Sequence, residues 1–152
     1  MRQLAARYLE KSDNCIAILD GDQRREQLDL MKKVRTHVET RYRNSETEIN
    51  EWIDTRLAFL PSNKWPERWL VETARNATDK AALTYTWGVD STARLDNALE
   101  NALLAGKHRE FFTLHEEMQQ PVGQIVCDLA RFVNKSQPED MEDIASKIEV
   151  ML

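Results

Sequence analysis

The chain has 152 residues, of which 41% are hydrophobic and 31% carry a charge. This balance is typical of a globular protein and excludes a disordered chain. Its 26 acidic and 21 basic residues give a net charge of −5, so the whole chain lacks the basic excess that is typical of nucleic-acid-binding proteins. The length suits one domain, or one domain with a helical appendage.

Cysteine usage and hydropathy indicate a reducing, aqueous compartment. Cys15 and Cys127 do not have a metal-type spacing, and we expect both to be buried free thiols. The sequence contains no apolar run long enough to span a membrane, and its amino end lacks the apolar stretch of a signal peptide. We therefore expect a cytoplasmic protein.

The first part of the chain is predicted to alternate helices with two strands. Helices are expected at about residues 2–10 and 23–43, the second with Leu28, Met31, Val34 and Val38 on one face. The run Cys15–Leu19 is short and rich in β-branched residues, which predicts a strand buried on both faces.

The second strand is expected at residues 57–60, where Pro61 ends it. Ser45 and Glu48 have the spacing of a capping box, which predicts a short helix before this strand. The long helical connection between the two strands favours a right-handed parallel crossover.

The rest of the chain has helical periodicity. Pro66 is well placed at the first position of a helix. After Asp90, four closely spaced amphipathic stripes follow, and Ser136 with Glu139 predicts a capping box for the last helix. One stripe contains Leu95, Leu99, Ala102 and Leu103, and the strongest contains Val122, Ile125, Val126, Leu129, Phe132 and Val133. The predicted class is α/β: a small parallel sheet flanked by helices at residues 1–78, and an all-helical tail at 79–152.

Two aspartates follow the first predicted strand in the segment Asp20-Gly21-Asp22. Ligands bind at the carboxyl ends of strands in open α/β sheets, and carboxylate oxygens suit Mg²⁺ or Mn²⁺. The same residues are also typical of an ordinary Asp-Gly turn, and the segment alone does not decide between the two. Arg24 and Arg25 follow and could contact a phosphate, although a solvated helix face explains them equally well.

Other catalytic patterns are missing from the sequence. The three histidines are far apart, and there is neither a nucleophile elbow nor a glycine-rich phosphate loop. Trp52, Trp65, Trp69 and Trp87 lie in or beside the region around Leu60, where packing explains them better than a base-stacking platform does.

The order of a helix, a buried strand and Asp20-Gly21-Asp22 resembles the second half of a Toprim domain. Toprim is the metal-binding α/β module of topoisomerases, primases and OLD-family nucleases. The segments Leu57–Pro61 and Pro66–Leu70 resemble the "LPG…PE" region of OLD-like ATPases, and the helical tail with Glu110-Phe111-Phe112 resembles their carboxyl end. Some of these ATPases serve in anti-phage systems of the Septu or retron type.

The resemblance implies that Asp20 and Asp22 bind Mg²⁺ or Mn²⁺ as catalytic residues in DNA cleavage or sensing during phage defence. It also implies a partner, either the remainder of an ATPase or a separate nuclease subunit. The upstream Toprim glutamate and the ATPase head are not in this sequence, and Ser62 stands where glycine is frequent. We therefore expect a partial Toprim-like region, from a larger enzyme or a truncated relative, that is incomplete as a catalyst.

An alternative of another class is a non-catalytic helical module that docks on a partner subunit. A two-stranded sheet covers its own edges poorly, which favours docking on further protein in either case. Glu67 is expected near the acidic pair, where favouring the amino end of its helix explains it better than binding a metal does.

Overall fold

The computed structural model describes residues 1–12, 14–39 and 46–149, and the chain forms two compact units. The first unit comprises Met1–Asn63 and Met141–Leu152, and the second comprises Lys64–Asp140. The boundary expected between residues 78 and 79 falls inside the second unit. The last helix, which was expected in the tail, belongs to the first unit.

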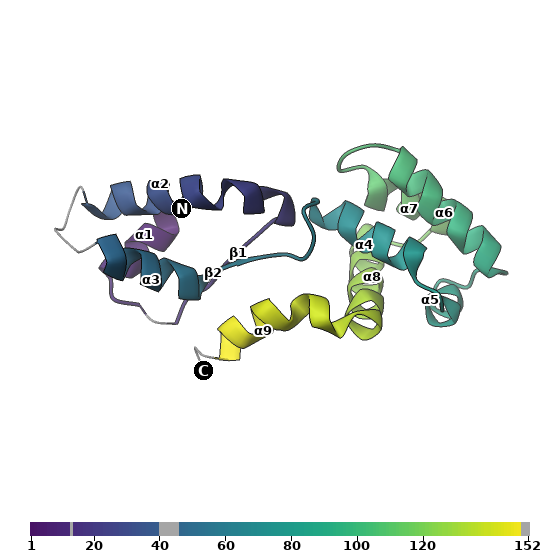
Figure 1. Cartoon of the computed structure of the whole chain (residues 1–152). Coiled ribbons are helices and arrows are strands. Elements are labelled where there is room, and N and C mark those ends of the chain that lie inside the picture. Colours follow the sequence, from purple (N-terminus) through teal and green to yellow (C-terminus); the bar gives the residue numbers. More distant parts are fainter. Residues whose placement is uncertain (13, 40–45, 150–152) are drawn as a thin grey trace. The chain divides into compact units, whose positions relative to one another are not determined.

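The first unit contains a small parallel sheet among helices. Its elements in chain order are α1 (Arg2–Leu9), β1 (Ala17–Leu19), η1 (Gly21–Glu26), α2 (Gln27–Glu39), α3 (Glu46–Arg56), β2 (Leu57–Phe59) and α9 (Glu142–Glu149) (Figure 1). The strands pair in parallel, with Ala17 opposite Leu57 and Leu19 opposite Phe59. The predicted parallel pairing through a helical connection is confirmed.

Burial of the first strand differs from the prediction. The side chains of β2 are all buried, whereas Ala17 and Leu19 in β1 are only half-buried and Ile18 is 44% exposed. Among the described residues β1 has a single neighbouring strand. The expectation of a strand buried on both faces was therefore wrong, because a central strand and a short edge strand can have the same apolar sequence.

The core of the first unit joins the helices to β2. On α2 it includes Leu30, Val34 and Val38, which are spaced four residues apart and so lie on one face. Leu28, which was expected on this face, is 82% exposed. The remaining buried members are Leu4, Ala5, Ile49, Ile53, Leu57 and Phe59. The capping box predicted at Ser45 lies outside the described residues.

Helix α9 packs on β2 within the first unit. Ile144 is buried, and Lys147 Nζ donates a hydrogen bond of 2.8 Å to the carbonyl oxygen of Leu57. The capping box predicted at Ser136 and Glu139 is wrong. Ser136 is the last residue of the preceding helix, and α9 begins only at Glu142 after a short 3₁₀ turn.

The second unit is helical throughout. Its elements are α4 (Pro66–Asn76), α5 (Ala81–Thr86), α6 (Thr92–Leu104), α7 (Glu110–Met118) and α8 (Val122–Ser136), and η2 (Pro138–Met141) leads out of it (Figure 1). Pro66 occupies the first turn of α4 as predicted. Gly106 follows the end of α6 with a φ of 97°, a left-handed conformation that favours glycine.

Two predicted stripes form the core of the second unit. Leu95, Leu99 and Ala102 of α6 are fully buried, as are Ile125 and Leu129 of α8. These helices pack with α4 and α7, and the apolar stripes are thereby removed from water. The predicted helical faces are confirmed here.

The two cysteines differ in burial. Both are free thiols, but only Cys15 is partly buried. Cys127 is exposed on α8, so its expected burial was wrong. Across the described residues, every helix is too short or too polar to cross a lipid bilayer.

Candidate functional site

The Asp20-Gly21-Asp22 segment lies at the carboxyl end of β1, as the sequence predicted. Asp20 is extended, with φ −61° and ψ 142°, and its carbonyl oxygen accepts a 3.0 Å hydrogen bond from the backbone amide of Gln23. The chain therefore leaves the strand directly into the 3₁₀ turn η1. Both aspartate side chains are half-buried.

Gly21 fixes this turn against the segment that follows β2. A Cβ atom at Gly21 would lie 2.3 Å from the carbonyl oxygen of Ser62 and 2.7 Å from that of Leu60. The backbone amide of Leu60 also donates a 2.8 Å hydrogen bond to the carbonyl oxygen of Leu19. The carboxyl ends of the two strands are thus held together. The backbone after β2 lies so close to residue 21 that only glycine fits there.

The two arginines that follow have contacts within the first unit. Arg24 Nη2 donates a 3.2 Å hydrogen bond to the carbonyl oxygen of Leu60, and its guanidinium carbon lies 5.7 Å from the centre of the Phe59 ring. Arg25 Nε donates to the carbonyl oxygen of Asp22 at 3.3 Å. Both side chains are nevertheless exposed. A guanidinium has five N–H donors, so donors remain for a ligand.

A hollow of about 370 Å³ is lined by Asp22, Arg24, Arg25 and Asn63. It therefore brings together three of the four residues that the sequence singled out, whereas Asp20 is not part of its lining. Sequence reasoning missed Asn63. The signal that could have found it is its place just after the second strand, because parallel strands end on the same side of a sheet.

The acidic pair offers oxygen ligands of the kind that Mg²⁺ and Mn²⁺ prefer. Among the described residues, no group of three or more His, Cys, Asp or Glu side chains is placed to hold a metal ion. Mg²⁺ is commonly held by one or two carboxylates together with substrate phosphates and water. Asp20 and Asp22 supply two carboxylates, the number that this mode of binding uses when the substrate supplies further ligands.

Glu67 lies in the first turn of α4, and its Oε1 is 3.2 Å from Nδ1 of His108. Its role at the helix end is consistent with this position. Glu67 belongs to the second unit and the acidic pair to the first, so the expected proximity of the two stays a prediction.

We expect Glu67→Gln to cost less than about 1 kcal/mol of unfolding free energy, because the helix-end charge is lost while glutamine keeps a side-chain oxygen for His108. Urea unfolding measures this cost. Titration with Mn²⁺ should give the same affinity as wild type. A large loss of Mn²⁺ affinity with an unchanged unfolding curve would instead make Glu67 a metal ligand.

No family model matches the chain, and comparisons with curated proteins and with solved structures find no match. The Toprim-like resemblance therefore remains an expectation from the sequence motifs.

Proposed function

We propose that the carboxyl end of the β1–β2 pair is a divalent-cation and DNA-phosphate site, the Toprim-like part of an OLD-like ATPase nuclease that acts in phage defence. The observation that carries this proposal is the hollow lined by Asp22, Arg24, Arg25 and Asn63. It combines a carboxylate, two guanidinium groups and an amide at the strand ends, where ligands bind in open α/β sheets.

Charge gives each residue a role in this proposal. Asp20 and Asp22 together balance Arg24 and Arg25, so these four side chains attract phosphate only weakly by themselves. Asp20 and Asp22 would hold a Mg²⁺ or Mn²⁺ ion, which would supply the excess positive charge and Lewis-acid activation of a water molecule. Arg24 and Arg25 would donate hydrogen bonds to phosphate oxygens and position the DNA backbone.

The metal site is tested by isothermal titration of the full chain with Mn²⁺. We expect saturable binding in the wild type and a loss of at least tenfold in affinity in the double variant Asp20→Ala, Asp22→Ala, because both oxygen ligands are removed. The matched control is Asp29→Ala, Asp54→Ala, which makes the same charge change at exposed positions of α2 and α3. Equal Mn²⁺ affinity in both double variants would contradict a metal site at Asp20 and Asp22.

Docking of the helical unit on a partner subunit is a second candidate function. Three large apolar side chains of this unit favour it: Tyr85 is 88% exposed, Leu104 77% and Phe112 58%. Apolar side chains that a partner covers are removed from water, so docking would bury these three. Replacing all three with serine should abolish co-purification with a partner ATPase or nuclease subunit, and unchanged co-purification would contradict docking.

A further inference from the structure

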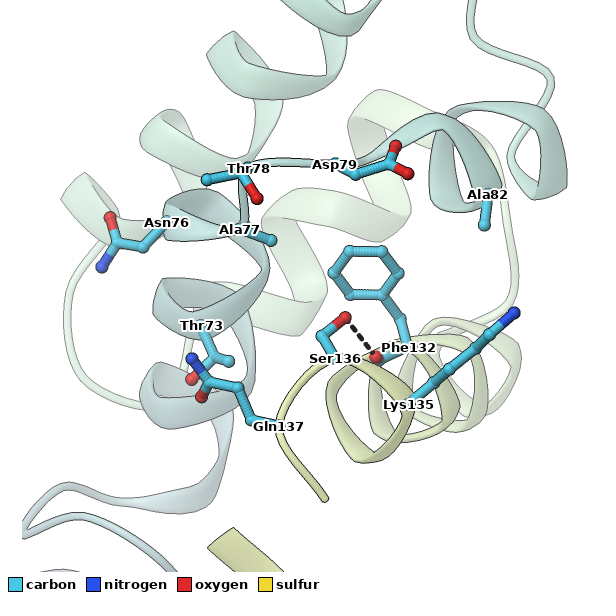
Figure 2. Close-up of a pocket in the computed structure, with 10 residues that line it drawn as sticks. All are labelled: Thr73, Asn76, Ala77, Thr78, Asp79, Ala82, Phe132, Lys135, Ser136 and Gln137. Atoms are coloured by element: carbon cyan, nitrogen blue, oxygen red, sulfur yellow. Dashed lines mark hydrogen bonds between the residues drawn. The ribbon is translucent and has the colours of Figure 1, made fainter. Parts of the chain in front are cut away.

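The second unit has a hollow of about 420 Å³ at the end of α8. Its walls come from the last turn of α4, the connection to α5, and the carboxyl end of α8 (Figure 2). Sites for small molecules commonly have volumes of about 300–1,000 Å³. The hollow is therefore large enough for a compact organic ligand, and none of its lining residues belongs to the acidic pair.

An aromatic ring stands in this hollow. Phe132 is half-buried, and its ring points from α8 toward Asp79 and Ala82 on the opposite wall (Figure 2). An aromatic face of this kind binds planar groups by stacking. In nucleic-acid recognition, such a contact is worth roughly 1–3 kcal/mol per base.

Side chains with hydrogen-bonding groups line the same hollow as the ring. Thr73, Asn76, Thr78 and Gln137 line the hollow, and their side chains make no hydrogen bond with the described parts of the chain. The two amides each carry a donor and an acceptor, which is what the edge of a nucleobase requires. By contrast, Ser136 Oγ is already used, since it donates to the carbonyl oxygen of Phe132 (Figure 2).

Positive charge lies on one side of the ring. A second hollow, of about 210 Å³, shares Phe132 and Lys135 with the first and is also lined by Arg131. Lys135 forms no ion pair within the described residues, and Arg131 has only a long contact, 3.9 Å, to Asp128. Asp128 already accepts hydrogen bonds from Trp87 and from another side chain of α8. Both cations are therefore available to an anionic group.

We propose that this pair of hollows binds a nucleoside phosphate, either free or as a nucleotide of single-stranded DNA. The base stacks on Phe132, the amides of Asn76 and Gln137 bind its edge, and Lys135 with Arg131 binds the phosphate. Inorganic phosphate would use the cations alone, and an uncharged sugar would leave the cations unused. A nucleotide is the ligand class that uses all three kinds of group.

The test is calorimetric titration of the full chain with AMP, with ribose 5-phosphate and with a short oligodeoxyadenylate. We expect AMP to bind about fivefold or more tightly than ribose 5-phosphate, because a stacked base adds roughly 1 kcal/mol or more. Tighter binding of the oligomer than of AMP would identify a single strand as the ligand. Equal binding of the oligomer and of AMP would identify a free nucleotide as the ligand. Either result would support the site.

Two variants locate the binding. Phe132→Leu removes the stacking face and Lys135→Gln removes a phosphate contact on an exposed side chain, so each should weaken AMP binding about fivefold or more. Lys107→Gln is the control, since it makes the same charge change outside both hollows. The Asp20→Ala, Asp22→Ala variant should bind AMP as wild type does, which separates this site from the metal site. Failure of AMP and the oligomer to bind, or unchanged binding in folded Lys135→Gln, would overturn the proposal.

Discussion

Gly21→Ala should destabilise the first unit by about 3 kcal/mol, near the upper end of the usual cost of overpacking. The added methyl group would lie 2.3 Å from the carbonyl oxygen of Ser62, 2.7 Å from that of Leu60 and 2.9 Å from that of Pro61. All three neighbours are backbone atoms, which cannot rotate away as a side chain can. Leu60 is also held by its hydrogen bond to Leu19, so relief of the clash requires the strand ends to separate.

Urea unfolding followed by circular dichroism measures this effect, and Gly123→Ala is the matched control. Gly123 is the second residue of α8, and nothing is within 4 Å of the position of an added Cβ. The same substitution there should therefore not destabilise the protein and should stabilise it by at most about 1 kcal/mol, because alanine has the higher helix propensity. If Gly21→Ala unfolded at the wild-type urea concentration, the close approach of the two strand ends would be wrong.

Separation of the strand ends has a functional consequence as well. Asp22 and Asn63 come from opposite sides of this contact and line the same hollow. We therefore expect Gly21→Ala to weaken Mn²⁺ binding although both aspartates are present.

Local periodicity was sufficient to predict the helical faces of the second unit. Leu95 and Leu99, and then Ile125 and Leu129, are spaced for one side of a helix, and an all-helical neighbourhood buries whichever side is apolar. The parallel pairing of β1 and β2 was also predictable, because a long helical connection between two strands allows it and a tight turn does not.

Choices between alternative partners could not be predicted in this way. The sequence of α2 offers both Leu28 and Leu30 as apolar positions, and only the packing of its neighbours selects Leu30. Helix α9 follows α8 in the chain, yet it packs on β2. The amphipathic stripe of α9 predicts that one face of the helix is buried, but it does not predict which element covers that face.

At the candidate site, too, local features could be predicted from the sequence and long-range contacts could not. Asp22, Arg24 and Arg25 were expected together because they are adjacent in sequence, and they line one hollow. The reason for Gly21 was predicted only in part. A turn at Gly21 could be predicted from the local sequence, but its contact with the backbone of residues 60–62 could not, because those residues are distant in sequence. Metal binding by Asp20 and Asp22 remains a prediction.

A buried carboxylate in the second unit was not predicted at all. Glu110 is the first residue of α7, it is completely buried, and its Oε1 accepts a 2.9 Å hydrogen bond from Nε1 of Trp65. Its Oε2 has no hydrogen-bond partner among the described residues. The two residues are 45 positions apart, and no local pattern connects them.

Glu110→Ala should therefore destabilise the protein by about 2–3 kcal/mol, because the indole N–H of Trp65 loses its acceptor and a cavity replaces the carboxylate. Glu110→Gln has nearly the same volume and keeps an acceptor oxygen for Trp65, so we expect it to unfold within about 1 kcal/mol of wild type. Both differences are measured by urea unfolding.

Trp65→Phe completes a double-mutant cycle with Glu110→Ala. If the hydrogen bond carries the effect, the double variant should lose less stability than the sum of the two single variants, since the second change removes a partner that is already unpaired. Lys107 and Arg68 lie beside the Trp65 ring, at 5.0 Å and 5.7 Å from its centre, and phenylalanine retains an aromatic face for them. Additive losses, or a Glu110→Gln variant as unstable as Glu110→Ala, would show that the hydrogen bond to Trp65 does not carry the effect.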